Sequence, residues 1–107
     1  MIISNKLNKY TNSLIKEFSL SNLEMCVSVG NTVMRFTPCE HDFKTVREIF
    51  KEISLFPLKN GERISFSAIR PGELSECIKR FKEWAELNGF FWADDEAEWN
   101  RLYELYK

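Results

Sequence analysis

The segment Cys39-Glu40-His41-Asp42 places the only histidine of the chain beside a thiol and two carboxylates. A cysteine nucleophile needs an imidazole that takes its proton, and residues two apart meet only in particular turns. The same four residues, just before an amphipathic run, are typical of a loop and a helix N-cap. We therefore expect no catalytic site here. We also expect no metal site, because zinc needs three or four ligands and the other cysteines lack the spacing.

A basic cluster formed by Lys79, Arg80 and Lys82 is the next group that could bind a ligand, namely a phosphate. Glu83 and Glu86 follow within one helical turn and can offset these charges. We interpret the cluster as a solvated helix face. The four glycines are isolated, so they form no phosphate-binding loop, and no cofactor is expected.

The last nineteen residues, 89–107, hold six aromatic residues and five acids. Aromatic rings supply buried area at protein interfaces, and carboxylates select a basic partner. The predicted partner-binding residues are Trp92, Asp94, Asp95, Glu96, Glu98, Trp99, Tyr103, Glu104 and Tyr106. The competing interpretation is a terminal helix with one face in the core. The Asp95 and Glu98 spacing resembles a capping box, which explains two of the acids without a partner.

Four segments have the apolar spacing of amphipathic helices. The residues expected to face inward are Leu7, Tyr10, Leu14 and Phe18 in the first, Phe43, Val46, Ile49, Phe50 and Ile53 in the second, and Leu74, Cys77, Ile78, Phe81, Trp84 and Ala85 in the third. The fourth helix begins with the acids at 94–96, where the helix dipole favours negative charge. Asp42 is the predicted N-cap of the second helix, and Gly89 ends the third.

Residues 23–37 alternate between apolar and polar around Gly30-Asn31, which predicts a β-hairpin with Val27 opposite Met34. Residues 63–69 predict a third strand beside it, and the apolar run at 90–93 would add a short fourth one if it pairs. We therefore expect a single α+β domain over residues 1–107. Its sheet should have three or four strands, include the 23–37 hairpin, and pack against about four helices.

The composition narrows the class of function. The chain has 107 residues and a net charge of -1, so it lacks the excess of basic residues that direct nucleic-acid binding requires. Three scattered cysteines indicate reduced thiols in a cytoplasmic protein. The N-terminus has no apolar run long enough for a signal peptide, and nothing predicts membrane binding.

These features favour a small cytoplasmic inhibitor that neutralises a basic, nuclease-like toxin. Bacterial immunity proteins work in this way, although the chain matches no residue motif of an immunity family. One alternative is a small ribonuclease-like enzyme that does not use histidine. Its phosphate contacts and bases would be Arg63, Arg70, Lys79, Arg80, Glu62 and Glu73. Another is an oligomeric structural or adaptor module, since the sequence leaves the oligomeric state open.

Overall fold

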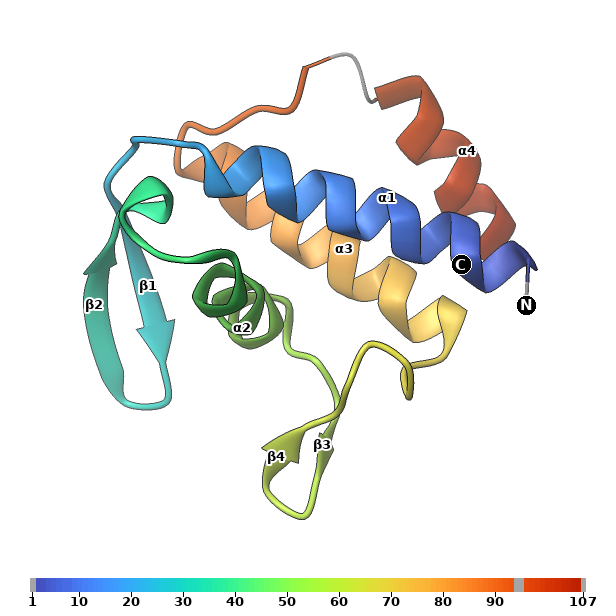
Figure 1. Ribbon diagram of the computed structural model, residues 1–107, viewed down its shortest axis with the longest axis horizontal. Helices are drawn as coiled ribbons and strands as arrows, with labels where there is room; N and C mark the ends of the chain where they lie inside the picture. Colours follow the sequence, from blue (N-terminus) through green and yellow to red (C-terminus); the bar gives the residue numbers. More distant parts are fainter. Residues whose placement is uncertain (1, 94–95, 107) are drawn as a thin grey trace.

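The computed structural model describes residues 2–93 and 96–106, with side chains from Lys6 onward. Its elements are α1 (Ile2–Ser19), β1 (Met25–Val29), β2 (Thr32–Phe36), the 3-10 helix η1 (Pro38–Glu40), α2 (Phe43–Ser54), β3 (Leu58–Lys59), β4 (Glu62–Arg63), α3 (Pro71–Leu87) and α4 (Glu96–Tyr106) (Figure 1). The predicted α+β class and the four predicted helices are confirmed.

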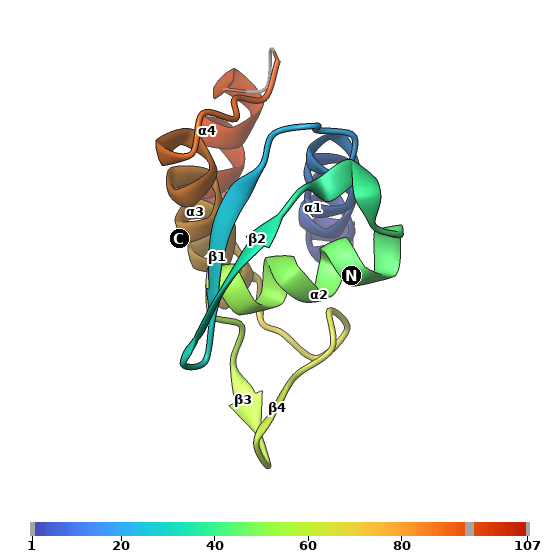
Figure 2. The same cartoon turned by 90° about the vertical axis from the view of Figure 1, so that its left-hand side faces the viewer.

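The helices make the body of the molecule, and the two hairpins lie at its edges (Figure 1). Helix α1 runs beside α3, while α2 crosses both at a steep angle (Figure 2). Helix α4 packs against α3, and the β1–β2 hairpin packs against α2 through β1. The apolar faces of α1, α2 and α3 therefore meet in the middle of the molecule.

The core forms because the inward faces predicted for three helices do point inward. Its largest fully buried side chains are Leu7, Ile15, Phe18, Met25, Val27, Phe36, Val46, Phe50, Phe56, Leu74, Ile78 and Phe81. Phe18 and Phe81 meet edge to face, with ring centroids 4.9 Å apart, which joins α1 to α3. Phe43 is an exception to the prediction: at the start of α2 it is 39% exposed.

The β1–β2 hairpin has the predicted register, with Val27 opposite Met34. Gly30 has φ 61°, at the first central position of the turn, where a type II′ hairpin needs a residue that tolerates positive φ. Met25, Val27 and Phe36 are buried on one face. Met34, on the same side, is 38% exposed although its partner Val27 is buried, because Met34 belongs to β2 and the hairpin packs against α2 through β1.

The predicted third strand at 63–69 is wrong, and the hairpin sheet has two strands rather than three or four. Only Glu62 and Arg63 are extended, in the separate β3–β4 hairpin. The chain then turns, with Ala68 N donating to Ser65 O at 3.0 Å. From this turn Phe66 packs against core rings, so the apolar alternation is satisfied without a strand.

The N-cap of α2 is the predicted one: the Asp42 carboxylate accepts a hydrogen bond from Thr45 N at 2.8 Å. The Thr45 donors lower the pKa of Asp42 below its ordinary value of 3.8. A carboxylate with a lowered folded-state pKa stabilises the fold above that ordinary value. Its contribution is lost as the pH falls through the lowered pKa.

Asp42→Ala should therefore lower the Tm at neutral pH, because the first turn of α2 loses an accepted hydrogen bond. The Tm difference from wild type, measured by circular dichroism, should shrink and vanish as the pH falls below 3.8. Glu40→Ala, which removes a nearby exposed carboxylate that does not cap α2, is the control and should leave the Tm nearly unchanged. A difference for Asp42→Ala that persisted in acid would contradict the cap.

Candidate functional site

The connection between α3 and α4 is tied to α1 instead of forming the short strand predicted at 90–93, which is wrong. Trp92 donates its indole Nε1–H to Leu14 O at 2.9 Å, and Ala93 N donates to Glu17 Oε2 at 3.1 Å. The connection therefore runs back along α1 (Figure 1). The Trp92 ring is half-buried, with Phe90 4.7 Å away between ring centroids.

Lys82 lies inside the molecule, at 7% exposure, so the prediction that it belongs to a solvated helix face is wrong. Its ammonium Nζ lies 4.9 Å from the Trp92 ring centroid, 5.8 Å from that of Trp99 and 5.9 Å from that of Tyr10. It also donates to the Tyr10 hydroxyl at 3.2 Å. An ammonium group surrounded by ring faces is stabilised by cation–π attraction, which offsets part of its desolvation. We call this group the lysine cage: Lys82, Tyr10, Trp92 and Trp99.

The aromatic residues of α4 face the other helices. Trp99 is half-buried and stacks on Tyr10, with centroids 5.7 Å apart and an interplanar angle of 12°. Tyr103 is half-buried and donates its hydroxyl to Glu76 Oε1 on α3 at 3.1 Å. Tyr106 is 8% exposed. These predicted partner-binding rings thus also hold α4 onto α1 and α3.

The end of α4 approaches the start of α3 closely. A Cβ at Gly72 would lie 3.2 Å from Tyr106 O, so glycine is the residue that allows this contact without displacement. Together with the rings, the contact fixes both ends of α4.

Three exposed carboxylates gather where α3 and α4 face each other. Glu83 and Glu86 on α3 and Glu96 on α4 line a hollow of about 250 Å³. We call it the acidic hollow. Its remaining lining residues are Lys79, Lys82, Phe91, Trp92, Trp99 and Asn100. Three predicted site residues, Trp92, Glu96 and Trp99, are therefore brought together here.

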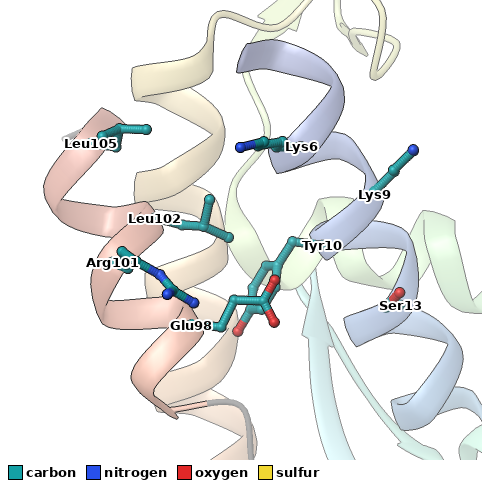
Figure 3. A pocket seen from close by; sticks show the side chains of 8 residues that line it. All are labelled: Lys6, Lys9, Tyr10, Ser13, Glu98, Arg101, Leu102 and Leu105. Atoms are coloured by element: carbon teal, nitrogen blue, oxygen red, sulfur yellow. The ribbon is translucent and has the colours of Figure 1, made fainter. Parts of the chain in front are cut away.

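The other predicted acids are elsewhere. Glu98 is exposed and lines a different cavity, of about 570 Å³, on the α1 side of α4 (Figure 3). Glu104 is exposed and lines neither of the two. Asp94 and Asp95 lie outside the described residues, and with them the predicted capping box. Helix α4 thus divides the predicted site between two surfaces.

Sequence reasoning missed Glu83, Glu86 and Phe91 as surface residues of interest, and it missed the burial of Lys82. A signal for Lys82 was present, because it occurs four residues after Ile78 and three before Ala85, both predicted to face the core. The spacing of Glu83 and Glu86 places these two on one face of α3, but nothing in the sequence indicates that Glu96 of α4 meets them.

The Cys39–His41 segment has the loop geometry expected for it. The His41 ring stacks on Phe36, with centroids 4.6 Å apart, and Cys39 N donates to Ser21 O at 2.9 Å. Within the part of the chain that the structure describes, no hydrogen bond joins the Cys39 thiol to the His41 ring. The segment thus consists of the 3-10 helix Pro38–Glu40 and the cap that leads into α2.

Several residues of the enzyme alternative have structural contacts. Arg63 makes two hydrogen bonds to the Glu52 carboxylate, at 3.0 and 3.2 Å, and a third to Phe56 O. Arg80 Nε donates to Ser54 O at 2.7 Å. Both guanidinium groups connect elements of the fold, so fewer of their donors remain for a phosphate.

Comparison with protein-family models, with curated proteins and with solved structures finds no match to the chain. Among residues 2–93 and 96–106, no helix is long and apolar enough to cross a membrane. The same residues contain no group of three His, Cys, Asp or Glu side chains that could hold a metal ion.

The three cysteines differ in accessibility, which gives a direct test of the core. Cys26 and Cys39 are exposed, whereas Cys77 is 1% exposed. Burial raises the pKa of the Cys77 thiol, and Arg80, 3.3 Å from its sulfur, acts in the opposite direction. Because the thiolate is the reactive form, Cys77 should be inert in the folded protein.

A thiol reagent at neutral pH should therefore modify two cysteines rapidly and the third only in denaturant. The Cys26→Ser/Cys39→Ser variant should show no rapid phase. A rapid phase in that variant would mean that the Cys77 thiol is accessible to the reagent, and would contradict its burial in the core.

Proposed function

We propose that the chain is a small binding protein that neutralises a basic protein partner through the acidic hollow, as an immunity protein neutralises a nuclease-like toxin. The observation that carries the proposal is the convergence of Glu83, Glu86 and Glu96 on one hollow between α3 and α4. Carboxylates from separate elements that face one space can receive a cationic side chain of a partner.

The charged groups that line the hollow differ in their exposure to solvent. The three carboxylates belong to exposed residues, whereas the Lys82 ammonium is held among rings. Lys79 is the exposed cation of the lining, and its Nζ lies 5.5 Å from the Tyr103 ring centroid. An approaching basic surface would therefore meet more negative than positive charge.

Apolar side chains beside the hollow supply the second requirement of an interface. Phe91 lines the hollow and is 68% exposed. Covering a large apolar side chain contributes about 2 kcal/mol, so Phe91 could serve as an anchor. Trp99 and Tyr103 remain predicted contacts to the partner. Unlike Phe91, they also hold α4 against the other helices.

The test is binding and inhibition of a basic nuclease-type toxin domain, beginning with one encoded beside this chain. Charge reversal by Glu83→Lys/Glu96→Lys should slow association about tenfold at low salt, since complementary charge mainly accelerates encounter. Stopped-flow fluorescence measures this rate, and toxin activity measures the loss of inhibition. Phe91→Ala should act mainly on dissociation, by about 2 kcal/mol if the ring is an anchor.

The matched control is Glu40→Lys/Glu62→Lys, which makes the same charge change at two exposed residues away from α4. It should leave both rates within about twofold of wild type. The sequence also predicts that Glu98→Lys/Glu104→Lys slows association. We expect a smaller effect than that of Glu83→Lys/Glu96→Lys, because neither Glu98 nor Glu104 lines the acidic hollow. If the hollow and control variants changed the rates equally, the interaction would depend only on the net charge of the protein. The hollow would then be excluded as the binding site.

A further inference from the structure

A second surface, of opposite charge, lies on the other side of α4. The cavity of about 570 Å³ between α1 and α4, which we call the α1–α4 groove, is lined by Lys6, Lys9, Tyr10, Ser13, Glu98, Arg101, Leu102 and Leu105. Three of these side chains are cationic and one is a carboxylate. The groove is therefore basic in a protein whose net charge is -1.

The spacing of the lining residues is the same on both helices. On α1 they begin at Lys6 and end at Ser13, and on α4 they begin at Glu98 and end at Leu105; each set falls at positions i, i+3, i+4 and i+7. Such a set forms one face of a helix. Two helix faces that line one cavity in this way form a groove that can receive a third helix.

The groove has an apolar floor and a basic edge. Tyr10 and Leu102 point into it from the two helices (Figure 3), and both are nearly buried, at 7% and 8% exposure. Leu105, at one end, is 64% exposed and would gain from being covered. Lys6 projects from α1 toward α4 at the level of Leu105, and Arg101 lies further along the groove, at the level of Glu98 (Figure 3).

We propose that the α1–α4 groove binds an amphipathic helix of a partner protein, with the apolar stripe of that helix on Leu102 and Leu105. Its acidic side chains would meet Lys6, Lys9 and Arg101, so the charges are complementary. Glu98 and the exposed Leu105 favour a protein helix over a nucleic-acid strand, because a phosphate backbone would be repelled by the carboxylate and gain nothing from the leucine.

The proposal is independent of the acidic hollow, since the two surfaces share no lining residue. A variant of the groove should leave binding of a basic partner at the hollow unchanged. Failure of one proposal can thus be told from failure of the other.

The test uses two synthetic peptides of about 15 residues, long enough to form a helix. Both carry leucines at i, i+3, i+4 and i+7, flanked by glutamates in one and lysines in the other. Fluorescence anisotropy should show binding of the glutamate peptide and none of the lysine peptide. Lys6→Glu/Arg101→Glu should weaken binding at least about tenfold, equivalent to about 1.4 kcal/mol.

The control Lys44→Glu/Lys59→Glu makes the same charge change at exposed residues outside the groove, and should alter binding less than about twofold. Leu105→Asp is a second groove variant, at a residue too exposed to be needed for folding, and should also weaken binding. Circular dichroism checks that each variant is folded.

Five results would overturn the proposal. The wild-type protein could fail to bind the glutamate peptide, or it could bind both peptides equally well. The control variant Lys44→Glu/Lys59→Glu could lose as much binding as Lys6→Glu/Arg101→Glu. A single-stranded oligonucleotide could bind more tightly than the peptide and be released by Lys6→Glu/Arg101→Glu, which would make the ligand a nucleic acid. A concentration-dependent dimer abolished by the same variant would make the occupant a second copy of the chain.

Discussion

The position of Lys82 is the constraint on which the C-terminal half of the molecule depends. Its ammonium is taken out of water, which is costly unless other groups replace the lost solvation. Three parts of the chain supply rings to this replacement: Tyr10 on α1, Trp92 on the connection and Trp99 on α4. The lysine cage can therefore form only when α4 lies against α1 and α3, and the placement of α4 follows from it.

The placement of α4 in turn creates both surfaces of functional interest. Because the rings of α4 turn inward, its charged side chains remain outside and are divided between its two sides. The side toward α3 completes the acidic hollow with Glu96, and the side toward α1 contributes Arg101 to the α1–α4 groove. One helix thus presents surfaces of opposite charge, and the aromatic residues that suggested an interface in the sequence support both surfaces from beneath.

What could be predicted from the sequence was local. The α2 cap depends on Asp42 and a backbone amide three residues away, and the hairpin register depends on a turn of two residues. Helix faces follow from spacing alone. These features need no knowledge of distant parts of the chain, and the structure confirms them.

What could not be predicted depends on contacts between distant residues. The apolar alternation at 63–69 is compatible with a strand, but Phe66 reaches the core from a turn because the partner rings lie within reach. Lys82 has the spacing of a core residue and the type of a surface residue, and it is buried where distant residues, among them Tyr10, Trp92 and Trp99, surround its ammonium. The acidic hollow and the groove likewise join residues from separate helices.

Hydrogen–deuterium exchange of α4 in Lys82→Met tests the central claim most directly, because methionine keeps a long unbranched side chain and removes the charge. If the caged ammonium holds α4 in place, the protected amides of α4 should exchange at least about tenfold faster, while those of α2 keep their protection. Lys59→Met makes the same change at an exposed residue of β3, away from α4, and should change neither. Unchanged or increased protection of α4 in Lys82→Met would show that the packing of the rings alone positions this helix, and would contradict the account.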